Sequence, residues 1–130
     1  MEEVNSKQKN AMLRALIKEF KERWTQYQSE GHQGDQVIKW ETDGWQWEWE
    51  VNNRYSMVYL AVELPGEYDW DTVKFSICVF ADEEPTIEIE VPMTDKALNR
   101  ATKSLVKWIK KEMLAGVDDN DIDMHIIALG

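Results

Sequence analysis

The chain has 130 residues, a net charge of −10 and one cysteine. This length suits a single domain over residues 1–130, and one cysteine cannot form an internal disulfide. The negative charge excludes nucleic acid and anionic membranes as direct partners, because their phosphates would be repelled, and it favours partners with a basic surface.

Residues 6–29 carry apolar side chains at steps of three and four, which predicts an amphipathic α-helix. Asn5 or Ser6 is a suitable N-cap, and Gly31 and Gly34 end the helix in a loop. The apolar stripe consists of Leu13, Leu16, Ile17, Phe20, Trp24 and Tyr27.

The next part of the chain predicts a meander of five antiparallel strands. Tryptophan recurs at every second position from Trp45 to Trp49, a spacing typical of a half-buried strand. The Asp43-Gly44 turn is a strong hairpin signal and pairs Thr42 with Trp45. The strands are expected at residues 36–42, 45–51, 55–63, 72–80 and 86–91.

A second two-residue turn is predicted at Asn52 and Asn53, because asparagine tolerates a positive φ. This turn would place Val51 opposite Arg54, and therefore Trp47 opposite Val58.

Residues 95–115 predict a second helix, capped by Thr94 and ended by Gly116, with an apolar stripe and a ridge of lysines. Residues 122–129 are expected to add a short last strand. The predicted fold class is therefore a two-layer α+β domain: helix, five-stranded antiparallel meander, helix and possible short C-terminal strand.

Both predicted turns place the same apolar side chains on one face of the sheet, and a one-residue slip would invert the faces. We expect the two helices to cover this apolar face. It consists of Ile38, Trp40, Trp45, Trp47, Trp49, Val58, Leu60, Val62, Val73, Phe75, Ile77, Val79, Ile87, Ile89 and Val91.

The opposite face mixes carboxylates with aromatic residues and methionine, a composition found both in interfaces and in ordinary solvated sheets. Lys39 is expected opposite Glu48 as a weak ion pair. The face consists of Val37, Lys39, Glu41, Gln46, Glu48, Glu50, Tyr55, Met57, Tyr59, Ala61, Glu63, Lys74, Ser76, Cys78, Phe80, Glu88 and Glu90.

Six of the seven tryptophans are predicted to lie in the core, because their spacing follows a strand or a helix. Trp70 differs, since it shares the 65–71 loop with Tyr68 and three acidic residues, and it is a candidate binding hot spot. Stacking of nucleic-acid bases on the tryptophans is disfavoured, because glutamates rather than basic residues lie between them.

No cofactor, catalytic or metal site is predicted. The acidic segment Asp118–Asp123 resembles the start of a calcium loop, but Met124 stands where such a loop requires glycine, which leaves at most a weak divalent site. Cys78, His32 and His125 have no catalytic signature around them, and Cys78 is interpreted as a filler residue.

A cytoplasmic location is expected. The first residues are polar and acidic, unlike a secretory signal, and no apolar run approaches the roughly 18 residues of a membrane span. A single thiol is compatible with a reducing compartment.

The charge is unevenly distributed, with a net −12 in residues 30–93 and a net +4 in residues 94–116. We therefore expect a small acidic binding or inhibitor protein, not an enzyme, that engages a basic surface of a partner macromolecule through the acidic and aromatic sheet face and blocks it. Its size, acidity and layout suggest action of the phage anti-defence or toxin-immunity type. The expected partner-binding residues are Glu48, Glu50, Tyr55, Tyr59, Glu88, Glu90, Tyr68 and Trp70.

Three alternatives stay open at this point. A cleft between helix and sheet, lined by a histidine, would indicate a small-molecule-binding protein or an enzyme. The basic helix ridge and the acidic sheet would allow self-assembly into a homo-oligomer. An exposed apolar groove would indicate an adaptor that holds a partner peptide.

Overall fold

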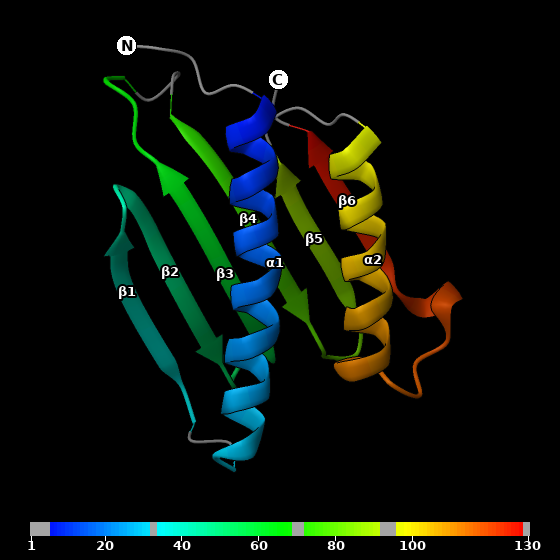
Figure 1. Ribbon diagram of the computed structural model, residues 1–130. Helices are drawn as coiled ribbons and strands as arrows, with labels where there is room; N and C mark the ends of the chain where they lie inside the picture. The colour runs from blue at the N-terminus through cyan, green and yellow to red at the C-terminus, as the bar shows by residue number, and fades with distance from the viewer. Residues whose placement is uncertain (1–5, 32–33, 69–71, 92–95, 129–130) are drawn as a thin grey trace.

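The computed structural model describes residues 6–31, 34–68, 72–91 and 96–128 (Figure 1). It is an α+β fold in which a six-stranded sheet, ordered β1-β2-β3-β4-β5-β6, carries two helices. The predicted helix, meander and helix are confirmed, and the short C-terminal strand is present. The elements are α1 (Ser6–Ser29), β1 (Gln36–Thr42), β2 (Trp45–Asn52), β3 (Met57–Leu64), β4 (Val73–Phe80), β5 (Thr86–Val91), α2 (Lys96–Glu112), the 3₁₀ turn η2 (Asp119–Asp121) and β6 (Asp123–Ala128).

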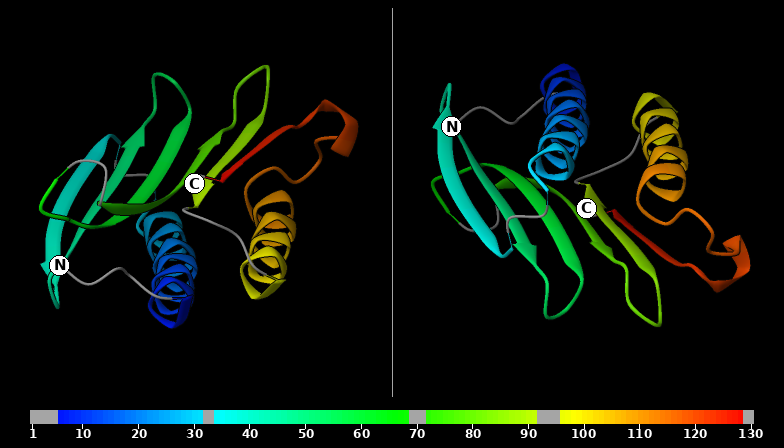
Figure 2. Two further views of the ribbon diagram at one scale, coloured as in Figure 1. Left: turned by 90° about the horizontal axis from the view of Figure 1, so that it is seen from above. Right: turned by 90° about the horizontal axis from the view of Figure 1, so that it is seen from below.

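Both helices lie on the same face of the sheet (Figure 2). Phe20 of α1 is fully buried and joins the layers, because its ring centroid lies 6.0 Å from Trp49 of β2 and 6.0 Å from Trp108 of α2. Both contacts are edge-to-face, a geometry that aromatic pairs prefer. The core therefore lies between the helices and the tryptophan face of the sheet.

The predicted inward position of the tryptophans is confirmed for six of them. Trp47 and Trp49 are buried. The other four are partly buried and pack against the same core; they are Trp24, Trp40, Trp45 and Trp108. Trp40 stacks on Trp47 with centroids 5.6 Å apart, and the guanidinium of Arg23 covers the Trp40 ring at 3.8 Å. The seventh, Trp70, lies outside the described residues.

The first hairpin has the predicted register, with Thr42 opposite Trp45. Asp43 and Gly44 adopt φ values of 53° and 82°. Two successive positive φ values are characteristic of the two-residue turn that matches the twist of paired strands. This turn therefore fixes which face of β1 and β2 meets the helices.

The second hairpin was predicted with the wrong register. Its loop has four residues, 53–56, so that Asn52 pairs with Met57 and Trp47 with Val62. Ser56, not asparagine, takes the positive φ, at 48°, and the Ser56 N–H donates to the Asn53 carbonyl at 3.3 Å. The register shift is an even number of residues, so the predicted faces survive.

β6 lies parallel to β5, whereas the other pairs of neighbouring strands are antiparallel. A helix is the usual connection between parallel strands, and here α2 supplies it. α2 ends at Glu112, before the predicted residue 115, because the Leu114 N–H donates to the Ile109 carbonyl in a helix-ending pattern. The expected caps Thr94 and Asn5 lie outside the described residues. Within the described part of the chain, neither helix has the length and apolarity to cross a bilayer.

Candidate functional site

The helix-free face of the sheet presents glutamates from β2 and from β5. Two lines of four residues cross this face from β2 to β5, and each line begins and ends with a glutamate. The lines are Glu50, Tyr59, Cys78, Glu88 and, next to it, Glu48, Ala61, Ser76, Glu90. These eight residues, with Glu63 and Lys74 beside them, form what we call the open face. Neighbouring strands lie about 4.8 Å apart, so the glutamates of β2 stand about 14 Å from those of β5.

The middle of the open face carries short side chains between its two acidic sides. Ala61, Ser76 and Cys78 are buried, because longer neighbouring side chains cover them. The four flanking glutamates are half-buried. The middle of the face therefore lies between two pairs of negative charges, with Tyr59 beside the short residues.

Two lysines on this side of the sheet are already engaged. Lys39 Nζ lies 3.8 Å from Glu48 Oε1, which confirms the predicted pair. The Lys74 ammonium lies close to Tyr59, Glu90 and Glu63, which all raise its pKa. The two lysines therefore offset only part of the charge of the five glutamates on the open face.

The pKa values of Tyr59 and Lys74 are both raised on the open face. Burial raises the pKa of Tyr59 above its ordinary 10.0, with smaller contributions from the charges of Glu48 and Glu90, while Lys74 opposes the shift. Partial burial lowers the pKa of Lys74, but the attraction of Tyr59 and of nearby glutamates outweighs it, so that this pKa lies above 10.5. The open face therefore holds an ammonium group in its charged form.

Cys78 lies on β4, between the two pairs of glutamates, and is buried. Burial, with smaller contributions from Glu88, Glu50 and Glu90, raises the pKa of its thiol from 9.0 to about 12. A thiol with so high a pKa is a poor nucleophile at neutral pH. Its environment agrees with the interpretation of Cys78 as a filler residue.

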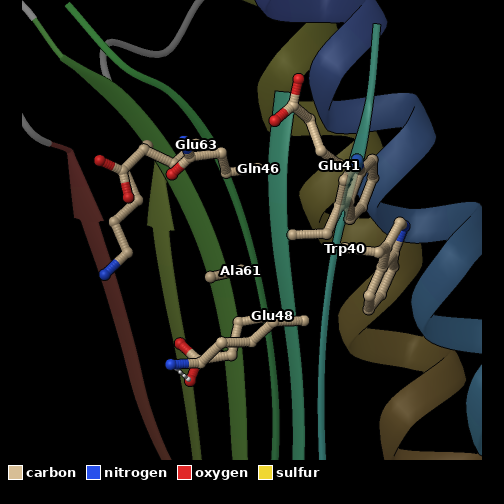
Figure 3. Close-up of a pocket in the computed structure, with 9 residues that line it drawn as sticks. Trp40, Glu41, Gln46, Glu48, Ala61 and Glu63 are labelled. Carbon is tan, nitrogen blue, oxygen red and sulfur yellow. Dashed lines mark ion pairs between the residues drawn. The ribbon is translucent and has the colours of Figure 1, made fainter. Parts of the chain in front are cut away.

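An open depression of about 510 Å³ lies at the end of the open face near Glu63 (Figure 3). In this view Glu48 and Glu63 point away from the side on which Trp40 meets the helices. Two lysines and three glutamates are among its lining residues. It is lined by Lys39, Trp40, Glu41, Gln46, Trp47, Glu48, Ala61, Glu63 and Lys74.

Five of the eight predicted partner-binding residues come together on the open face, namely Glu48, Glu50, Tyr59, Glu88 and Glu90. The other three do not. The predicted place of Tyr55 on the sheet face was wrong, because Tyr55 lies in the loop of the second hairpin and is 55% exposed. Its part in partner binding stays a prediction. Tyr68 is exposed in the loop after β3, and Trp70 lies outside the described residues.

Sequence reasoning placed Glu63 and Lys74 on this face but missed their part in the site. Lys74 lies opposite Glu63 across the β3–β4 pair and close to Tyr59. The 65–72 connection between these strands is not a tight turn, so the sequence did not define their register.

The acidic segment before β6 forms the turn η2. Asp118 caps this turn, with its carboxylate accepting the Asn120 N–H at 2.9 Å, and Asp119 lies 3.6 Å from Lys110 Nζ. Asp118 and Asp119 are thus both engaged by groups of the protein. Among the described residues no cluster of three or more acidic, histidine or cysteine side chains is arranged around a common point.

A second hollow, of about 180 Å³, lies between the ends of the helices and the second hairpin. Its lining is mostly apolar and includes Trp24, Val58 and Met113. His125 is not part of that lining, because it lies on β6, and His32 is outside the described residues. Among the described residues, no histidine lines this hollow.

Comparison of the chain with protein-family models, with curated proteins and with solved structures finds no match.

Proposed function

We propose that the protein is a stoichiometric binding protein whose open face engages a basic surface of a partner macromolecule and blocks it. The observation that carries this proposal is the pair of glutamates on each side of the open face, Glu48 and Glu50 on β2 and Glu88 and Glu90 on β5. Both helices lie on the other face, so a large partner can approach these carboxylates (Figure 2).

The acidic groups and the aromatic groups have different roles in this proposal. Clustered carboxylates steer a basic partner during diffusion and raise the association rate more than the affinity. Tyr59, Met57 and Phe80 are half-buried on the same side of the sheet and supply contact area once the partner has docked. Lys74 is a cation of the chain itself that lies on this face, where nearby glutamates favour its charged form.

A protein of this kind acts by occlusion, as an anti-defence or immunity protein does when it covers the basic, nucleic-acid-binding surface of an enzyme. We propose that it works in the cytoplasm, where the buried thiol of Cys78 stays reduced.

The test is a charge reversal of the four flanking glutamates to lysine, at Glu48, Glu50, Glu88 and Glu90. Each reversal adds two positive units, so the four take the net charge from −10 to −2. A control variant reverses Glu83, Glu84, Glu112 and Asp121, which are exposed and lie off the open face. The control makes the same change in net charge and isolates the effect of position.

The unmodified chain and both variants are used as bait with lysate from the native host, at low and at high ionic strength. We expect proteins captured by the unmodified chain and by the control to be lost with the open-face variant and at high salt. With a captured partner in hand, the association rate should fall at least about tenfold for the open-face variant. Equal capture by both variants, with the fold verified by circular dichroism, would refute the proposed function.

A further inference from the structure

We infer that β6 is a docking edge that accepts an extended segment of a protein partner as a seventh strand, and that this segment alternates apolar with basic residues. The outward backbone groups and the exposed apolar side chains of β6 make this strand a docking edge. The basic character of the segment rests on the proposed function of the open face.

Among the described strands, none neighbours the outer side of β6. In this part of the chain β6 is the last strand of the sheet and pairs with β5 alone (Figure 2). The Asp123 N–H donates to the Pro85 carbonyl at 2.9 Å, toward β5. Because the direction of backbone groups alternates along a strand, the N–H and C=O groups of Met124 and Ile126 point outward.

The side chains of β6 are apolar and exposed. Met124 is 47% exposed, Ile126 is 45% exposed and Ile127 is 41% exposed. Seven large apolar side chains in the described part of the chain are exposed, and three of them lie on this six-residue strand. Natural proteins usually protect a sheet edge with lysine, proline or a bulge, and Asp123–Ala128 contains neither lysine nor proline. By contrast, the opposite edge, β1, carries Lys39 and Glu41.

The two faces of β6 select different residues of an added strand. Met124 and Ile126 share the helix side of the sheet with Ile87 and Ile89 of β5. Residues of the added strand that face this side must be apolar, because only such residues extend the contact with Met124 and Ile126 without desolvating a polar group.

On the opposite side, His125 and Ile127 lie next to Glu88 and Glu90 of β5. An added strand would be two strand spacings from β5, or about 10 Å. A lysine or arginine side chain reaching over Ile127 and a glutamate reaching toward it together span this distance. Residues of the added strand on this side are therefore basic.

A second copy of the chain fits this edge less well. Its own β6 contains no lysine or arginine to meet Glu88 and Glu90. A two-fold pairing of β6 with β6 would also place two α2 helices on the same side of the joined sheet. α2 is a basic helix whose exposed cations are Arg100, Lys103, Lys107 and Lys111. Charge complementarity thus favours a basic segment of another protein.

The test uses capped synthetic peptides that match the six residues of β6 in length. One alternates valine with lysine, one alternates valine with threonine, and a third has the valine–lysine composition in two blocks. Hydrogen exchange of the protein's backbone amides is followed by NMR. We expect the alternating valine–lysine peptide to slow exchange at Met124 and Ile126 at least about tenfold, and to bind about tenfold more tightly than the valine–threonine peptide at low salt.

Two edge variants verify the position. Ile126→Lys and Met124→Lys each add a lysine to the exposed edge, and either should abolish the protection of the outward amides. Val37→Lys, at a 61% exposed position on β1, is the matched control and should leave the protection unchanged.

Different results separate this inference from the proposed function. If the alternating peptide binds without slowing exchange at Met124 and Ile126, the docking edge is refuted while the open face keeps its role. If the valine–threonine peptide protects these amides equally well, the basic character of the segment is refuted, while the open face keeps its separate test by charge reversal. If the amides of the protein alone become protected as its concentration rises, β6 pairs with a second copy, and the inference is wrong.

Discussion

The exposure of the acidic face depends on the helices packing against the tryptophan face, and Phe20 is the residue that tests this packing. Phe20 belongs to α1, is fully buried, and contacts one tryptophan from the sheet and one from α2. We therefore predict that Phe20→Leu destabilises the protein although leucine is apolar and almost fills the same space.

The expected loss can be worked out from these two contacts. An edge-to-face aromatic pair contributes about 0.5–1.5 kcal/mol beyond its area burial, so two pairs contribute about 2 kcal/mol. Phe20→Leu should lower the free energy of unfolding by about that amount. Phe20→Ala also leaves a cavity and should cost about 5 kcal/mol, at the upper end of phenylalanine truncations.

Urea unfolding, followed by tryptophan fluorescence and circular dichroism, measures both variants. A double-mutant cycle between Phe20→Leu and Trp108→Leu should give a coupling energy of about 1 kcal/mol. Tyr55→Leu, in the exposed hairpin loop, is the control and should change stability by less than about 0.5 kcal/mol. A loss below about 0.5 kcal/mol for Phe20→Leu, with no coupling to Trp108, would refute the packing of the helices on the tryptophan face.

Three further predictions concern the open face and the second hairpin. Because the pKa values of Tyr59 and Lys74 are raised in the folded protein, their contribution to stability is complete below pH 10 and is lost as pH rises through the raised values. Urea unfolding at increasing alkaline pH should show this loss, and Tyr59→Phe should reduce the dependence of the unfolding free energy on pH. With a pKa of about 12, the Cys78 thiol should react with iodoacetamide at pH 8 at least about 100-fold more slowly than in the urea-unfolded chain, and equal rates would contradict its burial. Ser56→Gly should raise the free energy of unfolding by up to about 1 kcal/mol, because glycine accepts the positive φ of 48° without steric cost, and a destabilised variant would show that the serine side chain is needed.

The sequence predicted the two faces of the sheet correctly, and the reason lies in the turns. At Asp43-Gly44 both turn residues accept a positive φ, so the length and register of the first hairpin followed directly. At the second hairpin, Asn52 and Asn53 gave the same signal, but Ser56 takes the left-handed conformation. No local sequence preference marks serine for that role.

Other features depend on contacts between distant parts of the chain. The parallel pairing of β6 with β5 results from the path of α2 across the sheet, which strand periodicity does not encode. The proximity of Lys74 to Tyr59 depends on the register of β3 with β4, which the 65–72 connection leaves undefined in the sequence. The unprotected edge at β6 became visible only once this strand was placed at the end of the sheet.

Carboxyl footprinting of the free protein and of its complex with a captured partner tests most directly the claim that the open face attracts and holds a basic surface. A carbodiimide with a nucleophile labels carboxylates that solvent can reach, and mass spectrometry locates the labels. We predict that Glu48, Glu50, Glu88 and Glu90 are labelled in the free protein and shielded in the complex, while Glu83 is labelled in both. Labelling of those four glutamates to the same extent with and without the partner would contradict the account.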